Sequence, residues 1–214
     1  EQFIAATTRH PMKVKVKIGA KNDGTLTAIQ MHVISNTGAY GNHGAPVLEH
    51  ACSESISVDA CENKKVDGYA VYTNTVPAGA FRGYGLPQTS FAIEQAIDEV
   101  ARMIGFDALE FRRRNVVRKG EPMIGAHVSP KDVIYGSYGL DQCIDLVDKA
   151  MKRGDGDKAP EGWKVGEGSA LTMIDTVPPG GHYSDTHIWL EADGTFAMTI
   201  GTAEFGNGTS TVHR

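Results

Sequence analysis

The alternation of apolar and polar side chains in the first third of the chain predicts β-structure. Lysines alternate with valine or isoleucine from Met12 to Ala20, and a second alternating run covers Leu26 to Ser35. Asn22-Asp23-Gly24 between the two runs is a strong hairpin signal, so we expect two half-buried antiparallel strands. A weaker alternation predicts a strand from Val66 to Thr75, and a short helix is expected around Val47 to His50.

Three later stretches have the spacing of amphipathic helices. The clearest runs from Pro87 to Ile104 and is followed by Gly105, a residue that favours the end of a helix. Asp107 is expected to cap a second helix that extends through Asn115. Within that helix, Arg112-Arg113-Arg114 is expected to form a solvated face. A third helix is predicted from about Leu140 to Lys152.

The remaining segments decide the predicted fold class. Glycines and prolines interrupt residues 117–137, which are expected to form a long loop, and a further linker lies near residue 160. Strands are expected after this linker, at 165–173, 187–191 and 196–202. Because the strands come as hairpins instead of alternating with helices, we predict an α+β fold with packed helices and a largely antiparallel sheet, not a doubly wound one. The change of pattern also predicts a domain boundary near residue 160.

Composition excludes several classes of protein. A net charge of -5 provides no basic excess to neutralise phosphates, so general nucleic-acid binding is not expected. No apolar run is long enough to cross a bilayer. The cysteines Cys52, Cys61 and Cys143 lack the spacing of a disulfide framework or a zinc site, which favours a reducing compartment such as the cytoplasm. The eight histidines include no HExxH pair, so no protein-ligated metal site is indicated.

Two glycine-rich loops contain the candidate chemistry. The first runs from Pro77 to Gln88 and directly precedes the clearest helix, and the second runs from Gly201 to Thr209. Backbone N–H groups in such loops and at helix N-termini can bind anions, so the two loops could grip a phosphate-bearing cofactor from two sides. On its local pattern alone, the first loop is explained equally well as a plain turn before a helix.

The two loops together resemble a known family. Ala80-Phe81-Arg82-Gly83-Tyr84-Gly85-x-Pro87-Gln88 and Glu204-Phe205-Gly206-Asn207-Gly208 are similar to the molybdopterin-binding large subunit of the xanthine dehydrogenase / aldehyde oxidase family. The likeness extends along almost the whole chain, including Thr8-Arg9-His10-Pro11 and Asp193-Gly194. It implies an internal fragment of a longer chain, with residues 1–160 from a first molybdopterin-binding domain and 161–214 from a second.

The resemblance also implies an activity. Members of this family hydroxylate aldehydes or electron-poor nitrogen heterocycles with water-derived oxygen at a molybdenum centre held by molybdopterin. Electrons then leave through [2Fe–2S] clusters and FAD, which here would be carried by partner domains or subunits. The family's glutamate base would lie beyond Arg214, so the fragment is expected to be inactive alone and to hold no catalytic residue. The alternative from another class is a non-catalytic binding or assembly module on the same fold.

Site residues follow from the resemblance position by position. The implied cofactor-binding residues are Phe81, Arg82 and Gly83 in the first loop and Phe205, Gly206 and Asn207 in the second, where the family's usual glutamine is shortened to Asn207.

The implied substrate-binding residues carry the specificity. Tyr84 matches an aromatic that stacks on the substrate ring, and Thr176 matches a substrate-proximal threonine. His50 stands where purine-oxidising members have an arginine, and an imidazole is a weaker, pH-dependent substitute. Asp175 stands where a second stacking phenylalanine is expected. These departures weaken xanthine as the substrate and leave another heteroaromatic ring or an aldehyde.

Overall fold

The computed structural model describes residues 6–121, 137–154, 156, 158–174 and 184–214. The chain divides into two compact units, residues 1–175 and 176–214. No helix in the described ranges is long and apolar enough to cross a membrane. Helices and sheets are mixed within the chain, which confirms the predicted α+β class. The predicted boundary between cofactor-binding domains near residue 160 stays a prediction.

The predicted hairpin forms the start of the first unit. β1 (Met12–Ala20) pairs antiparallel with β2 (Leu26–Gly38), and Val14 lies opposite Val33 in the register. The turn closes because the Asp23 carboxylate accepts the Thr25 N–H at 2.9 Å. Val14, Val16 and Ile18 of β1 and Ile29 and Val33 of β2 belong to the core or pack against it, while the lysines of β1 are exposed, as the alternation predicts.

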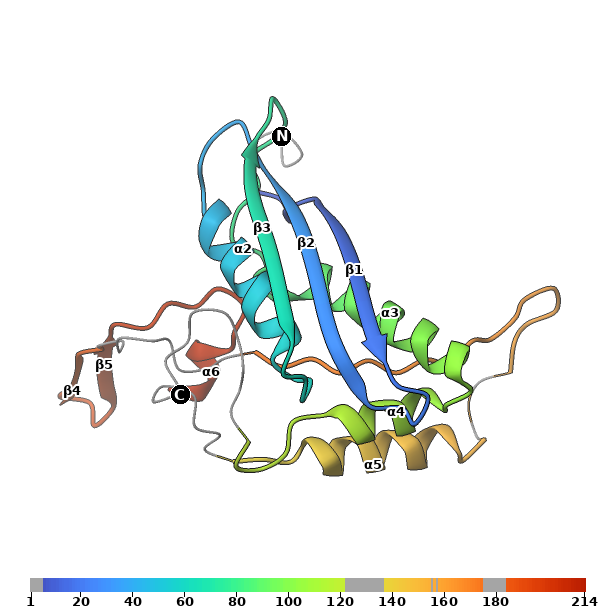
Figure 1. Ribbon diagram of the computed structural model, residues 1–214. Helices are drawn as coiled ribbons and strands as arrows, with labels where there is room; N and C mark the ends of the chain where they lie inside the picture. Colours follow the sequence, from blue (N-terminus) through green and yellow to red (C-terminus); the bar gives the residue numbers. More distant parts are fainter. Residues whose placement is uncertain (1–5, 122–136, 155, 157, 175–183) are drawn as a thin grey trace. The chain divides into compact units, whose positions relative to one another are not determined.

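The third strand pairs in a direction that the sequence did not indicate. β3 (Lys64–Tyr72) runs parallel to β2, so the sheet has the order β1-β2-β3 with one antiparallel and one parallel pairing. A parallel pairing needs a crossover connection, and α2 (Gly44–Ser53) with the 3-10 helix η1 (Glu54–Ile56) provides it. Figure 1 shows α2 and α3 (Leu86–Ile104) covering the same face of the three-stranded sheet.

The helices that follow agree closely with their predicted bounds. α3 ends at Gly105, whose φ of 77° is left-handed. α4 (Ala108–Asn115) is capped by the Asp107 carboxylate, which accepts two backbone N–H groups, and α5 (Leu140–Met151) packs beside it. The main core lies between the sheet and α3 and includes the buried side chains Ile29, Met31, Val33, Ile93, Ile97 and Phe111.

The prediction of a solvated arginine face is wrong for Arg112. Its guanidinium is buried; it donates to the Glu94 carboxylate at 2.8 Å and to the Asp98 carboxylate at 2.7 Å. Burial opposes the charged guanidinium, but the two carboxylates raise the pKa of Arg112 above its ordinary value. Arg113, by contrast, pairs with carboxylates at the surface, as expected.

The predicted strand at 165–173 is also wrong. This segment has no regular structure, and residues 168–174 line a pocket together with α3. The Leu171 N–H donates to the Glu94 carboxylate at 2.9 Å, so a side chain satisfies this backbone group in place of a neighbouring strand. Of the predicted loop at 117–137, residues 122–136 lie outside the described residues.

The second unit contains the last two predicted strands. β4 (Thr186–Leu190) pairs antiparallel with β5 (Phe196–Ile200), and Gly194 at the turn between them has a φ of 85°. A short helix, α6 (Thr209–Val212), follows the second glycine-rich loop.

Candidate functional site

The first glycine-rich loop is a compact double turn that lies against α2. The Tyr84 N–H donates to the Phe81 carbonyl at 2.7 Å, and the Leu86 N–H donates to the Gly83 carbonyl at 3.0 Å. Gly83, Tyr84 and Gly85 have consecutive φ values of 89°, 46° and 95°. A Cβ on Gly85 would lie 2.5 Å from the Val47 carbonyl of α2, so glycine is required by close packing as well as by φ.

Arg9, near the start of the chain, holds this loop in place. Its guanidinium donates to the Arg82 carbonyl at 2.7 Å and to the Gln88 side chain at 3.2 Å. It also lies over the Phe81 ring, 4.3 Å from the centroid. The Gln88 amide in turn donates to the His10 carbonyl at 3.1 Å. The segment before β1 therefore positions both loop residues that precede Gly83.

The structure brings two of the proposed substrate-binding residues together. The rings of His50 and Tyr84 are 5.1 Å apart between centroids and nearly perpendicular, at 84°. His43 meets Tyr84 as well: its Nδ1 is 2.5 Å from the phenol oxygen, with the rings at 83°. Because both imidazoles stand perpendicular to the phenol ring, neither of them occupies the parallel stacking position on Tyr84.

A buried carboxylate completes this cluster. The Glu54 side chain is almost fully buried and pairs with His50 Nδ1, while the His50 side chain remains 42% exposed. Burial raises the pKa of the Tyr84 phenol, which keeps it protonated and able to donate to His43. A histidine held through Nδ1 presents its other nitrogen, Nε2, to a ligand.

Sequence reasoning missed His43 and Glu54. They lie seven residues before and four residues after His50, spacings that place all three on one side of a helix. This stripe of polar residues on α2 and η1 was a usable signal, but the glycine-rich composition before Gly44 hid the start of the helix.

The second loop, in the second unit, is closed by its own acid. The Glu204 carboxylate accepts the N–H groups of Gly206 at 2.8 Å, Gly208 at 3.2 Å and Ser210 at 2.9 Å. These hydrogen bonds lower the pKa of Glu204, and the bond from the Ser210 N–H has the largest effect. The Asn207 amide also turns inward, with its Nδ2 3.4 Å from the Ala203 carbonyl. Phe205 is exposed.

Comparison with known proteins decides the family. A family model described as "Molybdopterin cofactor-binding domain" matches residues 1–116, more than half of the chain. The chain belongs to this family. The expectation from the two loop motifs is thereby confirmed.

This chain spans about a third or less of the length of the individual relatives that it matches. "Probable hypoxanthine oxidase XdhD" of Escherichia coli (strain K12) is 37% identical over 218 residues, which cover 99% of this chain and 23% of that protein. "Nicotinate dehydrogenase large molybdopterin subunit" of Eubacterium barkeri is 33% identical over 153 residues, 72% of this chain and 34% of that protein. A solved aldehyde oxidoreductase from Desulfovibrio gigas is 25% identical with a TM-score of 0.62, covering 90% of this chain and 21% of its own.

The first loop suits a molybdopterin-binding role. Among the described residues, the N–H groups of Arg82 and Gly83 have no acceptor, and the loop conformation around them is fixed by Arg9 and α2. Free N–H donors on a rigid, left-handed loop are suited to anionic or oxygen-bearing groups of a cofactor. In the second loop, the N–H groups of Gly206 and Gly208 are already taken by Glu204. Thr176 lies outside the described residues.

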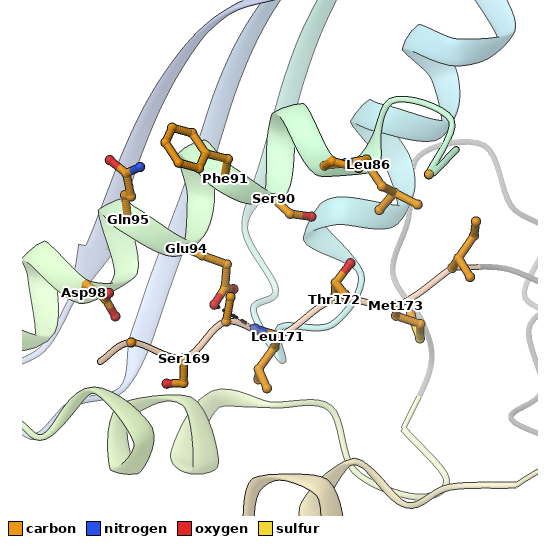
Figure 2. Close-up of a pocket in the computed structure, with 15 residues that line it drawn as sticks. Leu86, Ser90, Phe91, Glu94, Gln95, Asp98, Ser169, Leu171, Thr172 and Met173 are labelled. Atoms are coloured by element: carbon orange, nitrogen blue, oxygen red, sulfur yellow. Dashed lines mark hydrogen bonds between the residues drawn. The ribbon is translucent and has the colours of Figure 1, made fainter. Parts of the chain in front are cut away.

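A pocket of about 690 Å³ lies between α3 and residues 168–174 and is also lined by Gly83 of the loop. Figure 2 shows Leu86 and Phe91 of α3 opposite Leu171 and Met173, with the Glu94 carboxylate bonded to the Leu171 N–H. Glu94 Oε2 also accepts from Arg112 Nε at 2.8 Å, so this carboxylate links the segment around Leu171 to α3 and α4. Neither Tyr84 nor His50 lines this pocket, but Gly83 does, so the pocket adjoins the candidate site at the cofactor loop without containing the proposed ring-binding side chains.

Proposed function

We propose that the chain is part of a molybdenum hydroxylase that oxidises a heteroaromatic or purine-like substrate, or an aldehyde, with water-derived oxygen. The observation that carries this proposal is the cluster that Tyr84 of the cofactor loop forms with His50 and Glu54. The relatives named for hypoxanthine and nicotinate favour a ring, while the aldehyde oxidoreductase keeps the aldehyde as the second class.

Each residue has a role in this scheme. Tyr84 holds a flat substrate by offset stacking, and aromatic pairs of this kind contribute about 0.5–1.5 kcal/mol beyond area burial. His50, held by Glu54 through Nδ1, offers Nε2 to a polar group at the edge of the substrate. Thr176 is proposed as a second substrate contact.

The cofactor contacts are proposed on both loops. The backbone around Phe81, Arg82 and Gly83 holds the molybdenum end, and Phe205, Gly206 and Asn207 hold the pterin. When bound, the molybdenum cofactor supplies two-electron oxidation, with [2Fe–2S] clusters and FAD on partner domains or subunits as the electron path. We place the intact enzyme in the cytoplasm, on the grounds of its cysteine spacing.

The test compares the 214-residue chain with the full-length protein that contains it. Both are purified, their molybdenum and pterin contents are measured, and both are assayed in ¹⁸O-labelled water with hypoxanthine, nicotinate and butanal. We expect turnover and ¹⁸O incorporation only for the full-length protein. Turnover by the isolated chain contradicts the proposed inactivity, and no turnover by a cofactor-loaded full-length protein contradicts the proposed function and favours a binding module.

A further inference from the structure

His43 and Tyr84 share an uncommon backbone conformation. Among the described residues they are the two non-glycine residues with positive φ, at 50° and 46°, and their side chains are hydrogen-bonded to each other. Left-handed conformations of bulky residues cost free energy and persist where surrounding contacts enforce them, most often at ligand-binding sites. We infer that His43 is a positioning residue that fixes the Tyr84 ring for a planar ligand, an inference that rests on the proposed stacking role of Tyr84.

The position of His43 at the start of α2 does not explain why a histidine stands there. His43 is the N-cap of α2, a position that favours Ser, Thr, Asp or Asn because their side chains accept a free N–H of the first turn. The His43 side chain makes no such capping bond. Its imidazole is used instead for Tyr84, which is 41 residues away in the sequence.

The loop backbone alone does not fix the phenol ring. Gly83 and Gly85 hold the Tyr84 backbone, but the side-chain torsions of a tyrosine remain free to rotate. The bond from the phenol oxygen to His43 Nδ1 anchors the far end of the side chain, and His50 stands against the ring at 84°. His43 at the N-cap of α2 and His50 within α2 therefore set the plane of the ring before a ligand arrives.

Loss of this anchor has a defined cost. Immobilising one rotamer-rich side chain on binding costs about 0.5–1.5 kcal/mol, which corresponds to a loss of affinity of about twofold to tenfold. The loss should affect planar rings that stack on Tyr84. The KM for a small aliphatic aldehyde, which has no ring to stack, should stay unchanged. The molybdenum content should stay unchanged as well.

The test uses the full-length enzyme with three variants at the bond and with Tyr84→Leu, which removes the aromatic ring. His43→Gly keeps the positive φ and removes the imidazole. His43→Asn tolerates the same φ and places an amide near the position of Nδ1. Tyr84→Phe removes the phenol oxygen. The measurements are equilibrium binding of hypoxanthine, nicotinate and quinoline, KM and kcat for butanal, molybdenum content, and thermal unfolding.

We expect His43→Gly to weaken ring binding about twofold to tenfold and to leave molybdenum content and the butanal KM unchanged, with partial recovery in His43→Asn. In a double-mutant cycle, the His43→Gly and Tyr84→Phe shifts in ring affinity and in Tm should not add, because both remove the same bond. Additive shifts, or unchanged ring affinity in His43→Gly, overturn the inference.

If Tyr84→Leu binds rings as tightly as the parent enzyme, the stacking role itself fails. If Tyr84→Leu weakens ring binding and His43→Gly does not, the positioning role alone fails.

Discussion

The side chain of Arg9 donates a hydrogen bond to the carbonyl oxygen of Arg82, 73 residues further along the chain. The same guanidinium lies over the Phe81 ring and bonds to Gln88. Arg9, which precedes the first strand, therefore contacts three residues of the glycine-rich loop. The conformation of the proposed cofactor site depends on this contact between segments that are distant in the sequence.

Replacement of Arg9 should loosen that loop without unfolding the protein. In Arg9→Lys the charge remains, but the planar fork that reaches two acceptors and covers a ring is lost. We expect amide hydrogen exchange at Tyr84 and Leu86, whose N–H groups close the two turns of the loop, to quicken about tenfold, which corresponds to about 1.4 kcal/mol of local stability. Molybdenum content of the full-length protein should also fall. Lys13→Arg on the exposed face of β1 is the control, and equal exchange rates in Arg9→Lys and the parent protein would refute the clamp.

Two glycines separate the effect of close packing from that of backbone conformation. Gly85 and Gly105 have φ values of 95° and 77°, but an added Cβ meets the Val47 carbonyl at 2.5 Å only at Gly85, and nothing within 4 Å at Gly105. Gly105→Ala should lower the free energy of unfolding by about 1 kcal/mol, through φ alone. Gly85→Ala should cost at least about 2 kcal/mol more, because α2 or the loop must move. Denaturant unfolding measures both, and equal losses contradict the packing.

Arg112 should be the most sensitive of the three consecutive arginines. Arg112→Met leaves the buried Glu94 carboxylate without its cation, and breaking a buried pair on one side costs about 3–5 kcal/mol. Arg113→Met removes only surface pairs and should cost about 1 kcal/mol or less. Urea unfolding of the two variants provides the comparison. A loss of similar size in both would mean that Arg112 is solvated after all.

The buried Asp59 should make stability depend on pH in a direction opposite to most carboxylates. Burial, reinforced by the negative charge of Glu94, raises the pKa of Asp59 to about 7 from an ordinary value of 3.8. The folded state therefore binds a proton more tightly than the unfolded state does. The contribution of this group to stability is present below pH 4, falls as the pH rises from 4 to 7, and is level above 7.

The Asp59→Asn variant isolates this contribution. It should match the parent protein near pH 4 and exceed its stability near pH 8 by up to about 4 kcal/mol, since each pKa unit corresponds to about 1.4 kcal/mol. Unfolding free energies measured at both pH values give the difference. Asp185→Asn, at an exposed position directly before β4, is the control. A pH-independent difference between Asp59→Asn and the parent protein would contradict the raised pKa.

Local patterns predicted the secondary structure where local forces decide it. The β1–β2 hairpin, the Asp107 cap and the Gly105 stop were all readable because alternation, capping and left-handed φ are properties of neighbouring residues. The parallel pairing of β3 was not readable, since its direction depends on how α2 crosses the sheet. Arg112 was misjudged for the same reason: its partner Glu94 lies on another helix.

The candidate site shows the same division. The loop motif located Tyr84, the resemblance along the chain located His50, and the structure places their rings 5.1 Å apart. His43 and Arg9 were not assigned to the site because their partners in the loop lie 41 and 73 residues further along the chain. Glu54 was missed although it lies only four residues after His50.

The central claim is that Tyr84 holds the substrate ring while the backbone before it holds the cofactor. The most direct test is to measure hypoxanthine, nicotinate and quinoline affinity together with molybdenum content in full-length Tyr84→Ala, beside Tyr84→Phe, which keeps the ring. The account predicts that ring affinity falls about tenfold in Tyr84→Ala, with molybdenum content unchanged, and that Tyr84→Phe retains more affinity than Tyr84→Ala. Loss of molybdenum in proportion to the loss of ring binding would contradict it.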